Sequence, residues 1–151
     1  MFVLDSDYLS LIHLAESRLG GHLRRRMSEI GTTEFATTIA NFDEQTRGWM
    51  AVAARARRNA ELIDAYRRLE RHLRVYCSMP VLSFDENAAV RYQSLKAAKI
   101  KVGTMDLRIA AIVLSQNATL LSRNLVDFRR VPGLKLEDWT VDFEKLESSN
   151  D

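Results

Sequence analysis

Short β-prone runs alternate along this chain with longer stretches of helical periodicity, and few folds accommodate that pattern. The runs at Phe2–Leu4, at residues 80–84 and at Thr119–Leu121 have the length of buried strands and are too short for helices. Segments long enough for helices separate them, and strands that alternate with helices indicate a parallel sheet. We therefore predict an α/β fold in which a small, mostly parallel sheet is flanked by helices.

Two further segments complete the predicted sheet. Residues 32–39 are rich in β-prone side chains, and residues 134–139 are expected to form an edge strand. Gly20 and Gly21 are expected to separate the first two helices, and Asn41 is expected to cap the third, with Glu44 as the acid of a capping box. Helices are predicted over residues 8–14, 22–29, 41–56, 62–76, 85–99 and 107–114. The last of these is apolar almost all round, which predicts that it is buried.

The third and fourth predicted helices are expected to form an Arg-rich hairpin. Between residues 47 and 74 eight Arg stand against three acids, a net charge of +5. An apolar stripe at helical spacing is predicted to be the inner face; it comprises Leu62, Tyr66, Leu69, Leu73 and Tyr76. Such a charge concentration is typical of a nucleic-acid surface, although a solvated helix face explains it equally well.

Length and composition limit the other possibilities. A chain of 151 residues has the size of one domain, and a single cysteine, Cys77, excludes an intramolecular disulfide. The longest stretch without a formal charge covers only residues 109–122 and includes polar side chains, so we expect no membrane span. The first residues lack the features of a secretory signal, which favours a cytoplasmic protein. We expect one domain over residues 1–140 and an acidic tail over residues 141–151, frayed after Phe143.

Four acidic residues fall at strand ends, in loops and at helix starts. Asp5 follows the first predicted strand, Asp127 lies in the loop after the fourth strand, and Asp106 and Glu44 lie in first turns of helices. In open α/β sheets ligands bind outside the carboxyl ends of the strands, where these four side chains can converge. Each acid alone is equally well explained as a cap, a turn residue or a complement to a helix dipole.

A cluster of carboxylates beside very apolar segments becomes tolerable when a divalent cation neutralises it. Oxygen ligands of this kind suit Mg²⁺, with Mn²⁺ as a substitute. Zinc is disfavoured because His and Cys at ligand spacing are absent from the sequence. The acids therefore predict a magnesium site at the carboxyl edge of the sheet.

Four segments in this order resemble the PIN-domain ribonucleases of the VapC toxin type. The opening is similar at residues 2–10 (FVLDSDYLS), and the acidic helix start at residues 44–48 (EQTRG). The third acidic motif matches residues 103–111 (GTMDLRIAA), and the closing segment matches residues 122–134 (SRNLVDFRRVPGL) with 137–139 (EDW). Together they cover most of the chain up to Trp139.

The resemblance implies a PIN-like fold and a metal-dependent endoribonuclease, the toxin of a toxin–antitoxin pair. Asp5, Glu44 and Asp106 are then the expected metal ligands, directly or through water, and Asp127 completes the catalytic set. The expected partners are RNA, of the tRNA or ribosomal class, a cognate antitoxin and a second copy of the chain. Candidates for supporting or phosphate contacts are Ser6, Asp7, Ser122 and Asn124. Candidates for RNA binding are Arg55, Arg57, Arg58, Arg67, Arg68, Arg71 and Arg74.

The chain departs from the usual family pattern at a few positions. Ser6 and Ser122 stand where Thr is more usual, Asp7 replaces a common Asn, and Asn41 occupies a position where Thr or Ser is frequent. The acidic positions are intact, which favours an enzyme over the alternative. That alternative is a PIN-fold binding module without significant nuclease activity, which acts with a DNA-binding partner in transcriptional regulation.

Overall fold

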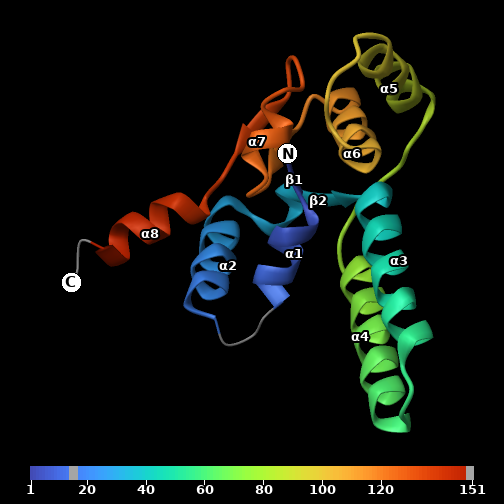
Figure 1. Ribbon diagram of the computed structural model, residues 1–151. Coiled ribbons are helices and arrows are strands. Elements are labelled where there is room, and N and C mark those ends of the chain that lie inside the picture. The colour runs from blue at the N-terminus through green and yellow to red at the C-terminus, as the bar shows by residue number, and fades with distance from the viewer. Residues whose placement is uncertain (14–16, 149–151) are drawn as a thin grey trace.

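The computed structural model of the chain describes residues 1–13 and 17–148 (Figure 1). Five strands form one sheet in the order β3-β2-β1-β4-β5, and every neighbouring pair is parallel. The strands are β1 (Phe2–Leu4), β2 (Phe35–Thr38), β3 (Val81–Leu82), β4 (Thr119–Leu121) and β5 (Lys135–Glu137). The predicted α/β architecture with a small parallel sheet is confirmed.

Helices cover both faces of this sheet, and two of them extend away from it. The helices are α1 (Ser6–His13), α2 (Arg18–Ile30), α3 (Ile39–Arg55), α4 (Asn59–Cys77), α5 (Glu86–Ala97), α6 (Thr104–Ser115), α7 (Leu125–Phe128) and α8 (Thr140–Ser148). A short 3₁₀ turn, η1, covers Thr32–Glu34. Figure 1 shows α1 and α2 on one side of the strands, α5 and α6 on the other, and the α3–α4 hairpin projecting from the body.

The core has two parts because neighbouring residues of a strand face opposite sides of the sheet. Val3 and Leu120 belong to the cluster built on α5 and α6, whereas Leu4 and Leu121 belong to the cluster built on α1 and α2. All four side chains are fully buried. Strands buried on both faces are expected to be apolar throughout rather than alternating, which explains these short runs.

Helix α6 lies under this sheet and is buried along most of its length. The five consecutive residues from Ile109 to Val113 have no exposed surface. A helix that is apolar all round must be covered on every side, and α5, the sheet and α7 supply that cover. The predicted buried helix is therefore confirmed, and its first turn brings Asp106 to the carboxyl end of the sheet.

The Arg-rich hairpin is confirmed, but its inner face differs from the predicted stripe. Tyr76 is buried as expected, whereas Tyr66 and Leu73 are more than half exposed. The inner face is formed instead with Ala65 and His72, both buried. The difference arises because the hairpin projects from the body, so α4 is covered by α3 on one side only (Figure 1).

The predicted break at Gly20 and Gly21 is wrong, because α2 continues through both. The helix begins after Ser17, whose hydroxyl accepts a hydrogen bond from the Gly20 backbone N–H at 2.9 Å. A Cβ atom at Gly20 would lie 2.3 Å from the carbonyl oxygen of Leu11. Glycine therefore permits close packing of α2 against α1 here and does not end a helix. Leu14, the end of the first predicted helix, lies outside the described residues.

The start of α3 also differs from the prediction. The strand β2 ends at Thr38, and Thr38 is the N-cap: its hydroxyl accepts a hydrogen bond from the Asn41 backbone N–H at 3.1 Å. Asn41 lies inside the first turn, and Glu44 follows it in the second turn. Neither residue is part of a capping box, which frees both side chains for contacts outside their own helix.

The C-terminal part is more ordered than predicted. Residues expected to fray after Phe143 belong to α8, which continues to Ser148, while residues 149–151 lie outside the described residues. Asp127, expected in a loop, lies in the short helix α7. Among the described residues, no helix combines the length and the hydropathy that crossing a membrane would require.

Candidate active site

Asp5 is the most buried of the candidate acids, with 8% of its surface exposed. It follows β1 directly, and its backbone N–H donates to the Leu121 carbonyl of β4 at 3.0 Å. Its Oδ1 accepts a hydrogen bond from Asn41 Nδ2 at 2.8 Å, and its Oδ2 accepts one from the Ser122 hydroxyl at 2.7 Å. Side chains from two neighbouring segments therefore fix both oxygens of this carboxylate.

Ser6 connects Asp5 to Glu44. The Ser6 backbone N–H donates to Asp5 Oδ1 at 2.8 Å, and the Ser6 hydroxyl donates to Glu44 Oε2 at 3.2 Å. Partial burial, followed by the charge of Asp5, raises the pKa of Glu44. Glu44 is nevertheless exposed, so it is the acid of this group that solvent reaches most easily.

Asp106 and Asp127 form the other half of the group, with Asn124 between them. Asn124 Nδ2 lies 3.2 Å from Asp127 Oδ2 and 3.4 Å from Asp106 Oδ2. Burial raises the pKa of Asp106 to about 6, and the charges of Asp5, Glu44 and Asp127 add to this effect. The pKa of Asp106 thus depends on the charges of the other three acids, so the four carboxylates lie close enough to interact electrostatically.

Asp7 lies beside this group and is held by backbone donors. Its Oδ2 accepts a hydrogen bond from the Arg123 backbone N–H at 2.9 Å, and its Oδ1 accepts one from the Tyr8 backbone N–H at 2.7 Å. Burial and then the charge of Asp5 raise the pKa of Asp7 to about 6. Asp7 therefore adds negative potential and anchors the segment after β4 to α1.

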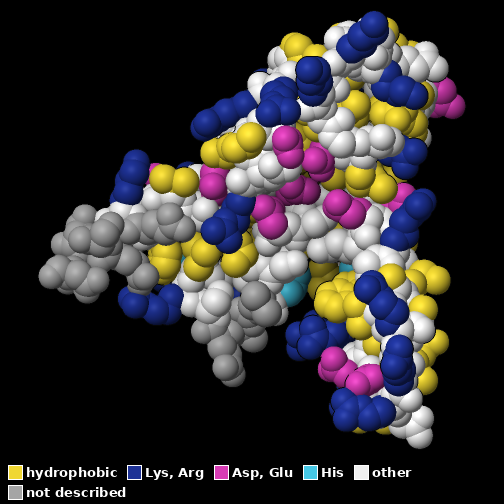
Figure 2. Space-filling model, viewed as in Figure 1, with side chains coloured by type: hydrophobic (Ala, Val, Ile, Leu, Met, Phe, Trp, Pro, Cys, Tyr) yellow, Lys and Arg dark blue, Asp and Glu magenta, His cyan; other side chains and the backbone are white. Residues whose placement is uncertain are grey.

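The contacts join the acids in two pairs at the carboxyl ends of β1 and β4: Asp5 with Glu44 through Ser6, and Asp106 with Asp127 through Asn124. Figure 2 shows Asp and Glu side chains gathered in the middle of the visible face. Within residues 1–13 and 17–148, however, no group of three or more His, Cys, Asp or Glu side chains is gathered closely enough to hold a metal ion as the side chains stand. The acids thus surround a common space without converging on one point.

The donor chemistry of this space fits a hard divalent cation. All four acids offer oxygen ligands, and in the described part of the chain none of them forms an ion pair with Lys, Arg or His. Mg²⁺ usually retains several waters and takes only one or two carboxylates directly. A loosely gathered set of acids therefore suits contacts that are partly direct and partly through water.

Two side chains that the sequence did not single out for the site position the acids. Gln45 Nε2 donates to the Ser6 carbonyl at 3.2 Å, and the Tyr76 hydroxyl donates to Gln45 Oε1 at 2.9 Å. Asn41, predicted only as a cap, supplies the amide that binds Asp5. The sequence spacing could have indicated this role, because residues three positions apart in a helix lie on the same face and Asn41 therefore lies on the face of α3 that carries Glu44.

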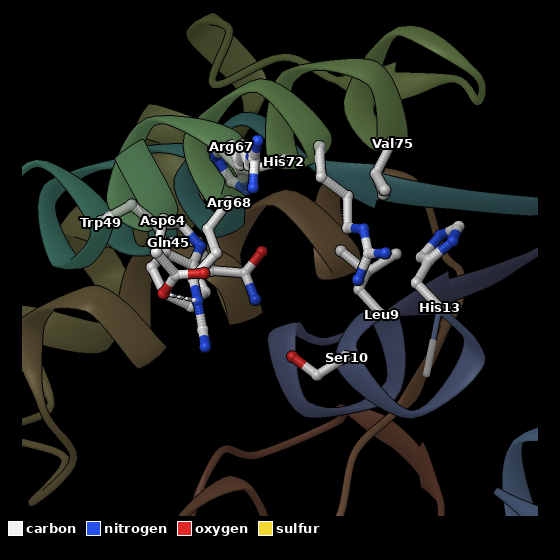
Figure 3. A pocket seen from close by; sticks show the side chains of 11 residues that line it. Leu9, Ser10, His13, Gln45, Trp49, Asp64, Arg67, Arg68, His72 and Val75 are labelled. Atoms are coloured by element: carbon white, nitrogen blue, oxygen red, sulfur yellow. Dashed lines mark hydrogen bonds and ion pairs between the residues drawn. The ribbon is translucent and has the colours of Figure 1, made fainter. Parts of the chain in front are cut away.

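A groove of about 630 Å³ adjoins the site between α1 and the hairpin. Figure 3 shows Leu9 and Ser10 of α1 facing Arg67 and Arg68 of α4 across it. Arg71 also lines the groove, so three of the predicted RNA-binding arginines border it. The groove wall also includes Trp49, whose ring lies 5.6 Å from the Arg68 guanidinium carbon.

The other predicted arginines lie outside this groove lining. Arg58 and Arg74 pair with acids of their own helix, Glu61 and Glu70, as Arg68 does with Asp64. Arg55 donates to the carbonyl of Ala51. Of the predicted Arg set, the groove therefore brings together only Arg67, Arg68 and Arg71.

The fold is a parallel α/β sheet, and the candidate site is a group of carboxylates at the carboxyl edge of that sheet. Residues 2–134 match the PIN domain, and the chain belongs to this family.

Curated relatives match only part of the chain. Ribonuclease VapC2 of Rickettsia felis is 45% identical over 65 residues, which are 40% of this chain and 48% of that protein. The tRNA(fMet)-specific endonuclease VapC of Salmonella typhimurium is 32% identical over 65 residues, 40% of this chain and 49% of that protein. Each match thus spans about half the length of the relative.

Solved structures show the same fold over almost the whole chain. VapBC2 of Rickettsia felis, bound to a DNA fragment from its promoter, superposes with a TM-score of 0.67 at 18% identity and covers 91% of this chain and 98% of that one. DNA-bound VapBC of Salmonella typhimurium gives 0.66 at 23% identity, with 91% and 97% covered. At these identities the likeness establishes the PIN fold.

Proposed function

We propose that this protein is a metal-dependent endoribonuclease and the toxin of a toxin–antitoxin pair. The observation that carries the proposal is the group of four acids, Asp5, Glu44, Asp106 and Asp127, which are linked in two pairs and form no ion pair with Lys, Arg or His in the described part of the chain. The family and the ribonuclease names of two partial relatives favour RNA as the substrate. Structural neighbours are toxin–antitoxin complexes, which supports a cognate antitoxin as partner.

Mg²⁺, or Mn²⁺ in its place, held by Asp5, Glu44 and Asp106, would supply charge stabilisation for the phosphate and a water of lowered pKa. The chain's own residues prepare that site. Asn41 and Ser122 keep Asp5 in one orientation. Asn124 donates toward both Asp106 and Asp127, which supports a role of Asp127 in orienting a water or completing a second, weaker ion site.

Ser6 and Ser122 are already engaged with carboxylates, so their first role is to position those groups. Asn124, in the segment after β4, contacts Asp106 and Asp127, whereas Asp7, in α1, holds that segment through the Arg123 backbone N–H. In the proposed hydrolysis a water attacks the phosphorus and the ribose 3′-oxygen leaves with a proton, so the products would carry 5′-phosphate and 3′-hydroxyl ends. No 2′,3′-cyclic phosphate would form, because the 2′-hydroxyl takes no part. The groove arginines Arg67 and Arg71 are available to bind phosphates of the substrate, which we expect to be tRNA or ribosomal RNA.

The test is incubation of the purified protein with structured RNA, with Mg²⁺ and with EDTA, followed by analysis of the product ends. We expect cleavage only with the metal and ends of the stated chemistry. Absence of metal-dependent cleavage of every RNA tested would refute the proposal. It would favour a PIN-fold binding module that acts with a DNA-binding partner, in line with the DNA-bound state of structural neighbours.

A further inference from the structure

A second concentration of positive charge lies on the side of the acids opposite the hairpin. Between residues 88 and 135 the only acids are Asp106 and Asp127, both in the candidate site. The same segment contains nine basic residues: Arg91, Lys96, Lys99, Lys101, Arg108, Arg123, Arg129, Arg130 and Lys135. Within this stretch of sequence no carboxylate outside the site offsets the charge, and Asp85 and Glu86 lie just before it at the start of α5.

The hairpin differs from this segment in the ion pairs that its basic residues form. All three acids between residues 47 and 74 pair with an arginine of the same helix at 2.5–2.9 Å. In the described part of the chain, no Lys or Arg between residues 88 and 135 forms an ion pair with a carboxylate. Side chains of the second group are therefore more available to an external anion.

Four of these cations lie close in the sequence to the acids Asp106 and Asp127. Lys99 and Lys101 lie in the loop that leads into the first turn of α6, where Asp106 is found. Arg129 and Arg130 follow α7, which contains Asp127, and all four side chains are exposed. We refer to Lys99, Lys101, Arg129 and Arg130 as the basic rim.

A direct contact joins the two loops that carry the basic rim. Arg130 Nη1 donates to the Lys101 carbonyl at 2.9 Å, so the rim is one continuous surface rather than two separate patches. Figure 2 shows Lys and Arg side chains over the end of the molecule formed by α5, α6 and α7, next to the acidic centre. The acids thus lie between the basic rim and the groove arginines.

We propose that the basic rim binds phosphates of the RNA strand on the α6–α7 side of the acids. This inference rests on the proposed function, because it places the phosphates beside the one that is cleaved. Phosphate contacts use Lys and Arg without requiring an apolar surface, whereas the cores of protein interfaces are depleted in Lys and enriched in aromatic side chains. The rim loops lead into the helix that carries Asp106 and out of the helix that carries Asp127, so a strand whose phosphate reaches these acids passes the rim, which favours a nucleic acid over an acidic protein.

The experiment measures binding of a labelled ten-nucleotide single-stranded RNA in EDTA at several salt concentrations. The test variant is Lys99→Gln/Lys101→Gln, which leaves the Arg130 contact to the backbone in place. The matched control is Arg25→Gln/Lys135→Gln, which removes two charges from α2 and from the start of β5. Lys135 contacts Asn117 at the amino end of the strands, away from the acids.

Each single-strand phosphate contact contributes about 0.7 to the slope of log affinity against log salt. We expect the rim variant to lose about 1.4 from this slope and about 25-fold in affinity at 0.1 M salt. The control is expected to bind as the wild type does. Equal binding by rim variant, control and wild type would overturn the inference.

Cleavage separates this inference from the proposed function. If the wild type cleaves RNA and the rim variant binds and cleaves equally well, the inference fails and the nuclease stands. If the rim variant loses binding while the wild type cleaves nothing, the inference holds and the nuclease fails. Binding of poly-glutamate with the same affinity and the same dependence on Lys99 and Lys101 would assign the rim to acidic proteins and overturn the inference.

Discussion

Replacement of Asp106 by Asn is expected to stabilise the metal-free protein. The substitution keeps the shape of the side chain but removes a charge that lies near three other carboxylates. Because burial and those charges raise the pKa of Asp106 from 3.8 to about 6, the folded protein holds this proton more tightly than the unfolded chain does. The wild type therefore loses stability as the pH rises from about 4 to about 6.

The size of the effect follows from the same shift. A rise in pKa from 3.8 to about 6 corresponds to about 3 kcal/mol for a fully shielded group. Asp106 is only half-buried, and solvent screening reduces this to about 1–2 kcal/mol. For a domain of this size we expect the melting temperature of Asp106→Asn to exceed that of the wild type by about 3–6 °C near neutral pH.

Thermal unfolding in EDTA at pH 7.5 and at pH 4 measures this directly, and Mg²⁺ titration at pH 7.5 completes the test. The stability difference is expected to disappear near pH 4, and the wild type is expected to gain more from Mg²⁺ than the variant does. Asp64→Asn is the matched control, since Asp64 pairs with Arg68 on the hairpin. If the wild type is the more stable protein in EDTA and neither protein responds to Mg²⁺, the four acids do not form one site.

Three further variants test other parts of the structure. Ser122→Ala removes a donor to Asp5 and an acceptor for a backbone N–H, and it is expected to cost about 1–3 kcal/mol in urea unfolding; an unchanged midpoint would contradict the contacts. Tyr8→Phe removes a hydroxyl that joins α1 to the segment after β5, with an expected loss of about 1–3 kcal/mol by the same assay; equal stability would show that this link is unimportant. Arg67→Gln/Arg71→Gln is expected to lower the slope of log RNA affinity against log salt concentration by about 1.4. An unchanged slope would show that these two arginines belong to a solvated helix face and do not bind phosphates.

The parts of the fold that were predictable depend on local pattern. The short strands and the helix centred on Ile109 follow from runs of apolar residues, because such runs can only be buried. The parts that were not predictable depend on contacts between distant segments. Gly20 is required because the carbonyl oxygen of Leu11 lies where a Cβ atom would be. The sequence does not show this contact, and Gly in a helical pattern is usually read as the end of a helix.

The same distinction applies to the candidate site. The acids were predictable because strand ends and helix starts collect at one edge of a parallel sheet. The partners that orient them were not, since Asn41 contacts Asp5 across 36 positions of the chain and Tyr76 contacts Gln45 across 31. The hairpin stripe was misjudged at Tyr66 because the sequence does not reveal that the hairpin leaves the body.

The most direct measurement is the rate of Mg²⁺-dependent RNA cleavage by Asp5→Asn, with circular dichroism to verify the fold. The charge-matched control is Asp142→Asn, since Asp142 pairs with Arg26 and lies outside the groove and the basic rim. Asp5 is the acid held by the most contacts, so loss of its charge is expected to reduce the rate more than 100-fold while the control cleaves normally. A tenfold change in rate corresponds to about 1.4 kcal/mol of barrier, which is too little for a residue that holds the metal. A folded Asp5→Asn protein that retains more than about a tenth of the wild-type rate would contradict a carboxylate-centred nuclease site.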